Sequence, residues 1–287
     1  MSLPPKDYRS ISPSAKALLW MKALTDIPFA RETAVLVFGA DNLPTETNER
    51  VNEAFLKRLA HFESRYRSID AGLAMLGIPN ILELASGYSF RGLQKALWDD
   101  VYYLDTDLPE TIDTKEQILP ALLRSLEARP IGHFQRLGLN AVRAGAGAVQ
   151  NRFPPGPVVC VNEGLLVYLD EAEKRACCAF VRDLIQNRGG YWVTGDVYVR
   201  GPGRQPDELS AQVAQFLKDH RVEENKFESF DEAEAFFRSC GLRLKWKAEA
   251  AEEDLDSIAL LRKRWAWPIG HRFRGTTRET WILEAAP

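Results

Sequence analysis

The sequence of 287 residues contains no apolar run of the roughly 20 residues that a helix needs to cross a bilayer. This absence predicts a protein without a membrane span. The first residues also lack the apolar segment of a signal peptide, so we expect a cytoplasmic protein. The cysteines have no metal-ligand spacing, so we expect reduced thiols that bind no metal at the four positions Cys160, Cys177, Cys178 and Cys240.

An excess of charge of one sign is missing as well. Lysine and arginine together number 37 against 40 acidic residues, and the net charge is −3. Because the composition is not strongly basic, a nucleic acid is not expected as the main partner. The histidines have neither metal-ligand spacing nor a flanking acid that indicates a catalytic triad, so no role is assigned to His61, His133, His220 or His271.

A strand, a tight turn and a helix follow one another over residues 80–98. Residues 80–84 are an apolar run with one acid, Glu83, and the small residues 85–87 come next. Such a turn lets backbone N–H groups and a helix N-terminus face a ligand without side chains in the way. The pattern therefore predicts a ligand site at this turn.

Two acids end the next predicted strand, residues 101–104. Asp107 lies 20 residues after Gly87 (107 − 87), where an α/β nucleotide fold binds a ribose hydroxyl pair. Asp105 remains the alternative ribose ligand. A dinucleotide motif G-x-G-x-x-G is absent, because the spaced positions are Ala85, Gly87 and Ser89.

Glu83 bears on the identity of the nucleotide. It lies two residues before the small-residue turn, where methyltransferases of this fold carry an acid, and this favours S-adenosylmethionine. Two alternatives stay open: an ordinary βα turn that binds another ligand, and a structural Glu83 that accepts hydrogen bonds from local backbone groups.

Strand and helix patterns alternate from residue 81 onward, which predicts a mainly parallel sheet with helices on both faces. We expect the seven-stranded, Rossmann-like sheet of a class I methyltransferase, in which five parallel strands are followed by a closing pair with a terminal antiparallel strand. A helix over residues 110–127 is expected to break near Pro120, and residues 200–207 are expected to be a loop. The expected strands are 80–84, 101–104, 133–139, 157–161, 191–197, 242–246 and 280–284.

The first 75 residues are expected to form an N-terminal helical cap over the ligand cleft. Amphipathic helices are predicted over residues 14–24 and 49–62. Residues 76–287 are then the catalytic domain that binds S-adenosylmethionine. The alternative is that the N-terminal segment only packs against the sheet.

Three stretches together resemble the leucine carboxyl methyltransferase family. They are NILELASGYSFR (80–91), YLDTDLPE (103–110) and VVCVNEGLLVYLD (158–170). This family of S-adenosylmethionine-dependent O-methyltransferases includes protein phosphatase methyltransferases and bacterial polyketide O-methyltransferases. The resemblance covers about residues 65–181, whereas the two ends of the chain fit only in layout.

The resemblance implies a set of cofactor contacts. Gly87 and its neighbours would lie against the methionine half, Asp107 would bind the ribose hydroxyls and Leu108 would lie beside the adenine. Glu163 would lie close to the methionine amino group, and Arg65, or alternatively Arg67, would bind the methionine carboxylate. The full expected set is Arg65, Glu83, Ala85, Gly87, Asp105, Asp107, Leu108, Leu139, Asn140, Glu163, Gly164 and Tyr168.

Two positions depart from the family pattern. Ser89 stands where the family turn has an acid, and Gly138-Leu139-Asn140 stands where the family has Asp-Leu-Arg. The acid that would accept a hydrogen bond from the adenine amine is therefore absent, and the amide oxygen of Asn140 is a substitute. These departures bear on cofactor affinity rather than on cofactor identity.

The resemblance implies transfer of a methyl group to a small-molecule acceptor by in-line displacement. A carboxylate acceptor is favoured over a hydroxyl because a carboxylate is ionised at neutral pH and needs no general base. No catalytic residue is assigned. The alternatives are a catalytically silent S-adenosylmethionine-binding protein and an NAD-dependent oxidoreductase, and the oligomeric state stays open.

Overall fold

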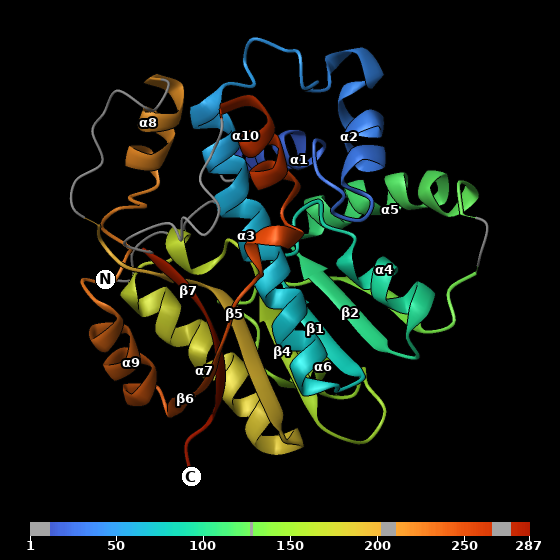
Figure 1. Ribbon diagram of the computed structural model, residues 1–287. Coiled ribbons are helices and arrows are strands. Elements are labelled where there is room, and N and C mark those ends of the chain that lie inside the picture. Colours follow the sequence, from blue (N-terminus) through green and yellow to red (C-terminus); the bar gives the residue numbers. More distant parts are fainter. Residues whose placement is uncertain (1–11, 127–128, 202–210, 266–276) are drawn as a thin grey trace.

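Seven strands form one sheet in the computed structural model, which describes residues 12–126, 129–201, 211–265 and 277–287. The strand order is β3-β2-β1-β4-β5-β7-β6 (Figure 1). Among the described strands, β7 alone is antiparallel to its neighbours β5 and β6. This order confirms the expected class I methyltransferase layout. The strands are β1 (Asn80–Leu84), β2 (Tyr102–Asp107), β3 (His133–Gly138), β4 (Val158–Asn162), β5 (Gly190–Tyr198), β6 (Leu242–Ala248) and β7 (Arg278–Ala285).

The central strands are buried on both faces. Every residue of β1 and β4 is buried, as expected for parallel strands that helices cover on each side. The chain runs from β1 to β2 and β3 in one direction and from β4 to β5 in the other. The strand order therefore reverses between β1 and β4, and ligands of such sheets bind outside the carboxyl ends of the strands at that point.

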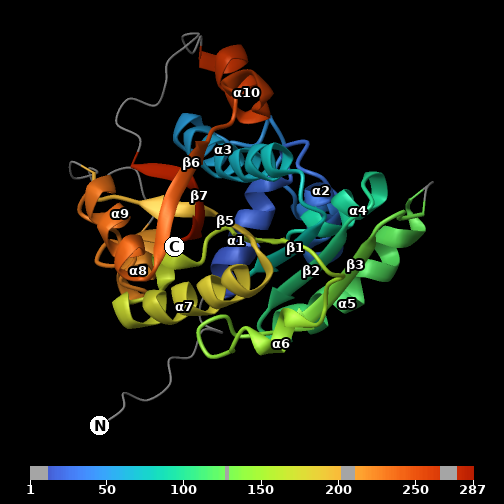
Figure 2. The same ribbon diagram turned by 90° about the horizontal axis from the view of Figure 1, so that it is seen from below.

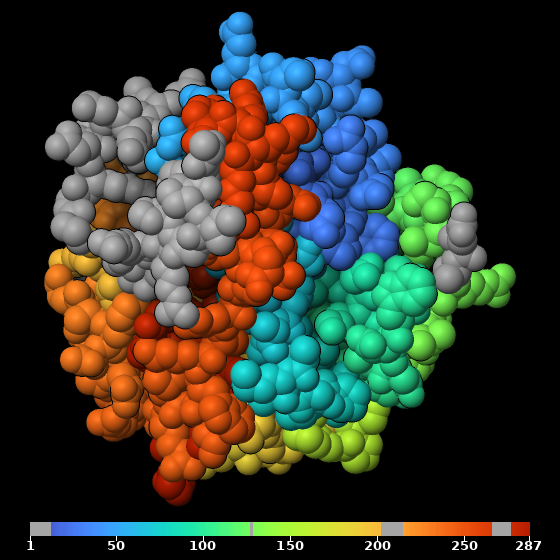
Figure 3. All heavy atoms as spheres, viewed as in Figure 1, coloured from blue at the N-terminus to red at the C-terminus, as the bar shows by residue number. Residues whose placement is uncertain are grey.

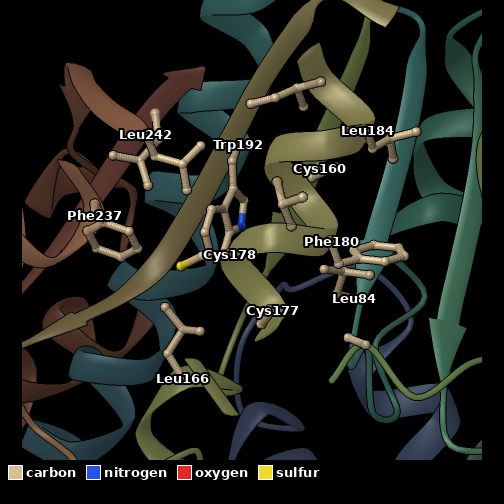
Figure 4. Close-up of a cluster of buried hydrophobic side chains, with 14 of the residues drawn as sticks. Leu84, Cys160, Leu166, Cys177, Cys178, Phe180, Leu184, Trp192, Phe237 and Leu242 are labelled. Carbon is tan, nitrogen blue, oxygen red and sulfur yellow. The ribbon is translucent and has the colours of Figure 1, made fainter. Parts of the chain in front are cut away.

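Helices form a layer on each face of the sheet (Figure 2). On one face, α3 (Glu53–Leu76) and α4 (Arg91–Trp98) pack against the sheet through apolar side chains. On the other face lie α6 (Gly147–Gln150), α7 (Glu171–Arg188) and α9 (Phe230–Ser239). Their core includes Trp192 of β5 and Phe180 and Leu184 of α7 (Figure 4).

The remaining helices pack at the edges of the sheet or on other helices, such as α3. They are α1 (Ser12–Lys22), α2 (Ala30–Phe38), α5 (Pro109–Arg124), α8 (Ala211–Asp219) and α10 (Asp256–Trp265). The apolar side of α10 packs on α3 through Ile258 and Leu261, which meet Leu56 and Leu59. On the surface, the red α10 accordingly lies beside the blue N-terminal helices (Figure 3). None of the helices that the structure describes could span a membrane.

Two helices differ from the sequence-based expectation. α3 is one continuous helix of 24 residues, whereas the sequence predicted an end near residue 62. The charged residues Glu63 and Arg65 interrupt the apolar pattern, but both are buried and have partners in the structure. α5 continues through Pro120 to Arg124, so the expected break is wrong. Most of the predicted 200–207 loop lies outside the described residues.

The division into a cap (1–75) and a catalytic domain (76–287) stays a prediction. α1 lies over the cleft described below, whereas the second half of α3 packs on the sheet. Gly72 allows this close approach, because a Cβ there would lie 3.0 Å from Val193 of β5. The N-terminal segment thus contains both a part that lines the cleft and a part that belongs to the helix layer.

Candidate functional site

A cleft of about 850 Å³ opens at the carboxyl ends of the parallel strands, where the strand order reverses. Helix α1, the loops after β1 to β4, the middle of α3 and helix α8 all contribute to its walls. Ten of the twelve expected site residues line it: Arg65, Ala85, Gly87, Asp107, Leu108, Leu139, Asn140, Glu163, Gly164 and Tyr168. Glu83 and Asp105 do not.

The turn after β1 is held in place by Asp107. Ala85 and Gly87 have φ values of 51° and 56°, in the left-handed region. The Gly87 N–H donates to Asp107 Oδ2 and the Leu108 N–H donates to Oδ1, each at 2.7 Å. Burial raises the pKa of Asp107. A carboxylate has about four lone-pair sites, so two remain for hydroxyl donors from the cleft.

Asp105 has a different surrounding from Asp107. It is buried and paired with Lys115 of α5, which also donates to Ser86 Oγ (3.0 Å) and to the Ser89 carbonyl. Lys115 therefore ties β2 to the turn after β1. Sequence reasoning missed it, although a signal was present: this lysine lies on the apolar face of α5 with Ile118, where an unpaired charge would be costly.

Glu83 also lies behind the cleft. Its carboxylate accepts hydrogen bonds from Arg91 Nη1 and from the Tyr103 hydroxyl, both at 2.7 Å. Burial raises its pKa to about 6. Both oxygens have side-chain partners and Glu83 does not line the cleft, so this geometry does not support a cofactor contact. The donors are side chains and not the local backbone groups of the structural alternative.

Three cationic side chains surround Glu163 at the other end of the cleft. Lys22 Nζ lies 2.6 Å and Arg65 Nη2 3.3 Å from Oε1, and Arg91 Nη2 lies 3.1 Å from Oε2. Although burial alone would raise it, these cations hold the pKa of Glu163 far below its usual range. Lys22 and Arg65 line the cleft together with Glu163. Lys22 was missed by sequence reasoning, which had no signal for a contact across 141 residues.

Asp196 of β5 holds the loop that carries Glu163 through backbone hydrogen bonds. This carboxylate accepts from the backbone N–H groups of Gly164 (2.7 Å), Leu165 (2.6 Å) and Leu166 (3.1 Å). Gly164 has a φ of 76°, and a Cβ there would lie 3.2 Å from Arg65 Nη2. Glycine at this position therefore lets the Arg65 guanidinium approach the loop.

Two further side chains, Tyr198 and His61, form hydrogen bonds that hold Arg65 in place. Its Nη1 donates to the Tyr198 hydroxyl at 3.0 Å, and that hydroxyl lies 2.9 Å from His61 Nε2. Sequence reasoning missed both residues, since Tyr198 is 133 residues away from Arg65. Arg67, the alternative to Arg65, pairs with Asp26 and does not line the cleft.

The departures from the family pattern have local explanations. The Ser89 hydroxyl accepts from the Arg91 N–H at 3.2 Å, at the start of α4. A Cβ at Gly138 would lie 3.2 Å from Pro109 Cα, so the close packing of α5 on β3 favours glycine there. Asn140 lines the cleft, but its Oδ1 already accepts from the Val142 N–H at 3.0 Å.

Several solved structures are similar to this chain, all at low sequence identity. A variant of LepI in complex with SAH and a substrate analogue is 11% identical, with a TM-score of 0.45 over 73% of this chain and 43% of that chain. The mitomycin 7-O-methyltransferase MmcR is 12% identical, with a TM-score of 0.46 over 93% and 60%. This chain thus spans less than two thirds of either protein.

A third similar structure matches along its length. It is a DUF574 family protein from Streptomyces avermitilis, 16% identical, with a TM-score of 0.49 over 94% of this chain and 97% of that chain. No protein-family model and no curated protein matches the sequence.

Proposed function

We propose that this protein is an S-adenosylmethionine-dependent O-methyltransferase of the leucine carboxyl methyltransferase type. The main support for the proposal is that one cleft contains two polar sites of different kinds. Asp107 lies at one end with lone pairs left for hydroxyl groups, and Glu163 lies at the other end between Lys22 and Arg65. A ribose and a zwitterionic amino acid are the two ends of this cofactor.

The nucleoside half fits the end of β2. Asp107 accepts from the two ribose hydroxyls, as carboxylates at this place in α/β nucleotide folds do. Leu108 and Leu139 provide apolar contact for the adenine. The backbone of the turn at Ala85 and Gly87 lies beside the sugar and the start of the methionine chain, because small residues there leave the space open.

The methionine half fits the charges at the end of β4. Its ammonium lies against Glu163, and its carboxylate lies against the guanidinium of Arg65 and the ammonium of Lys22. Charge-assisted hydrogen bonds of this kind are about twice as strong as neutral ones. Lys22 comes from α1, so this helix contributes directly to the amino-acid end of the site.

The acceptor takes the part of the cleft beside α3 and α8. Phe62, Phe216 and Leu217 make this part apolar, and Arg58 adds a cation. We propose a small-molecule carboxylate as the acceptor in the cytoplasm, with a hydroxyl as the alternative. The cofactor supplies an activated methyl group, so the chain has to align the acceptor and exclude water.

Binding and turnover are tested separately. S-adenosylhomocysteine at 100 times its dissociation constant should stabilise the protein by roughly 2.7 kcal/mol, a clear rise in melting temperature. NAD should leave the melting temperature unchanged, and a rise with NAD alone would point to an oxidoreductase. Incubation with methyl-labelled S-adenosylmethionine and a panel of carboxylic acids then measures transfer. Cofactor binding without transfer to any acid or phenol would favour a silent binding protein.

A further inference from the structure

Arg58 lines the cleft but has no part in the proposed cofactor contacts. Among the described lining residues, the cationic ones are Lys16, Lys22, Arg58 and Arg65. Lys22 and Arg65 pair with Glu163 and are assigned to the methionine half of the cofactor. Lys16 is exposed, whereas Arg58 is half-buried. Arg58 therefore gives information on the other ligand of the cleft, the methyl acceptor.

The acids of the described lining lie in the part of the cleft that is assigned to the cofactor. They are Asp107, Glu110 and Glu163. Asp107 is assigned to the ribose and Glu163 to the methionine ammonium. Glu110 is in the first turn of α5, two residues after Leu108, which is assigned to the adenine. The charges of the lining thus favour an anionic acceptor, because its cation Arg58 is not assigned to the cofactor.

Helix α3 contributes Arg58, Phe62 and Arg65 to the cleft as one row. These residues are four and three positions apart, a spacing that places side chains on the same face of a helix. Since a helix rises about 1.5 Å per residue, the backbone positions of Arg58 and Arg65 are about 10 Å apart. The Arg65 guanidinium carbon lies 5.2 Å from the centre of the Phe62 ring. An aromatic ring therefore separates the two cations of the row.

Helix α8 adds further apolar side chains to the same cleft. Phe216 and Leu217 line it, and the Phe216 ring lies 6.3 Å from that of Tyr168, which lines it too. Leu217 packs on the cluster that contains Tyr198, and the Tyr198 hydroxyl accepts a hydrogen bond from Arg65. These contacts bring α8 next to the part of α3 that carries the row. The space beside the row is thus bounded by aromatic and aliphatic side chains.

We propose that the methyl acceptor is an aromatic dicarboxylate and that Arg58 binds the carboxylate that does not react. This inference rests on the proposed methyl transfer and names the substrate class of the same cleft. The ring of the acceptor packs against Phe62 and Phe216. A planar guanidinium matches a carboxylate in bidentate geometry, so Arg58 fixes both the charge and the orientation of the remote group.

The second carboxylate of the acceptor is the one that reacts. One of its oxygens forms a bond to the methyl carbon while the carbon–sulfur bond breaks, and the bonding electron pair stays on the sulfur. The positive charge of the sulfonium and one negative charge of the acceptor disappear together, and no proton moves. The product is a monoester. A second transfer is disfavoured, because the neutral ester would then have to take the place of the anion at Arg58.

Binding is measured first, because it does not require turnover. The protein saturated with S-adenosylhomocysteine is titrated calorimetrically with terephthalate and with 4-methylbenzoate, which has the same ring and a similar shape but one carboxylate less. We expect terephthalate to bind at least about tenfold more tightly, which corresponds to about 1.4 kcal/mol. Equal affinities, or no binding of terephthalate, would overturn this inference. Absence of S-adenosylhomocysteine binding would instead overturn the proposed function itself.

A pair of variants tests the role of Arg58. Arg58→Met should weaken terephthalate binding about tenfold and leave the affinities for 4-methylbenzoate and S-adenosylhomocysteine unchanged. Lys57→Met is the matched control, because Lys57 is the neighbouring residue, pairs with Glu53 at 2.7 Å and does not line the cleft. Equal losses in the two variants would contradict the assignment. A loss of S-adenosylhomocysteine affinity in Arg58→Met would show that Arg58 binds the cofactor instead.

The product and the kinetics give an independent measurement. With methyl-labelled S-adenosylmethionine and terephthalate, mass spectrometry should detect the monomethyl ester and no accumulation of the dimethyl ester. In Arg58→Met, KM for terephthalate should rise about tenfold with little change in kcat, because the remote carboxylate is bound equally before and during the transfer. Dimethyl ester formed as fast as the monoester, or a loss confined to kcat, would count against a remote anchor at Arg58.

Discussion

Two of the carboxylates that line the cleft, Asp107 and Glu163, are held in opposite ways. Asp107 accepts two backbone N–H groups, and burial raises its pKa. Glu163 accepts from three cationic side chains, which lower its pKa. Asp107 thus keeps lone pairs for further neutral donors, whereas Glu163 belongs to a buried group of opposite charges. The same edge of one sheet provides both.

The largest expected effect concerns the stability of the Glu163 end. Glu163→Gln removes the negative charge that Lys22, Arg65 and Arg91 share. Arg65 keeps its pair with Asp196 and Arg91 its pairs with Asp70 and Glu83, but Lys22 loses its described acidic partner. Breaking this buried ion pair should lower the free energy of unfolding by about 3 kcal/mol. Urea unfolding of the protein without cofactor measures this. The matched control is Glu116→Gln, which breaks an exposed pair with Arg136 and should cost less than about 1 kcal/mol. Equal losses would show that the charges around Glu163 are not coupled to folding.

The stability lost in Glu163→Gln should depend on pH. The folded-state pKa of Glu163 lies below its ordinary value of 4.5, so the stability that its charge contributes is present above pH 4.5. It is lost as the pH falls further below 4.5, because the folded protein then takes up the proton later than the unfolded chain. The difference between wild type and Glu163→Gln should therefore be constant from pH 7 to pH 5 and shrink below pH 4.5. A difference that grows on acidification would contradict this.

The second effect concerns cofactor binding at the Asp107 end. Asp107→Ala removes the acceptor that we propose for the ribose hydroxyls and should weaken binding of S-adenosylhomocysteine by roughly 1.5–3 kcal/mol. Asp105→Ala is the control, because Asp105 pairs with Lys115 and does not line the cleft. Its cofactor affinity should fall clearly less, although its stability should fall. Calorimetric titration of both variants decides between the two acids, and the reverse order would move the ribose site to Asp105.

Local sequence patterns predicted the sheet and the Asp107 end. β1 and the first half of β2 are mainly apolar, and the acid that ends β2 follows from the order of residues in the chain. The turn at Ala85–Gly87 and Asp107 are likewise joined by a contact across only 20 residues. Patterns of this kind are visible because strand, turn and acid are neighbours in sequence.

The Glu163 end could be predicted only in part. Glu163 was placed in the site by the resemblance of residues 158–170 to a known family, but Lys22, 141 residues earlier, has no periodic signal that identifies it. Glu83 was placed in the site because it comes two residues before the turn, and Asp105 because it lies at the end of a strand. Their partners, Arg91 and Lys115, hold both acids behind the cleft. Which acid faces a ligand depends on packing between elements, and this is absent from local patterns.

A third prediction tests the contribution of α1 to the Glu163 end. Lys22→Met keeps much of the side chain's length but removes the charge that we assign to the cofactor carboxylate. The affinity for S-adenosylhomocysteine should fall about tenfold, which corresponds to about 1.4 kcal/mol. Lys16→Met is the matched control, because Lys16 lies on the same helix and lines the cleft but is exposed. If both variants lose the same affinity, the effect is one of general charge and not of the contact with Glu163.

The smallest expected effect lies behind Arg65. Tyr198→Phe keeps the ring but removes the hydroxyl that accepts from Arg65 Nη1 at 3.0 Å and contacts His61. A hydrogen bond to a charged group contributes about 1.5–3 kcal/mol, but Arg65 keeps its contacts with Glu163, so only part of this should be lost. We expect a two- to fivefold weaker affinity for S-adenosylhomocysteine, roughly 0.4–1 kcal/mol. Tyr191→Phe, at the other end of the same strand and outside the cleft lining, serves as the comparison. A loss for Tyr198→Phe as large as that for Lys22→Met would mean that Tyr198, and not the Glu163 carboxylate, determines the position of Arg65.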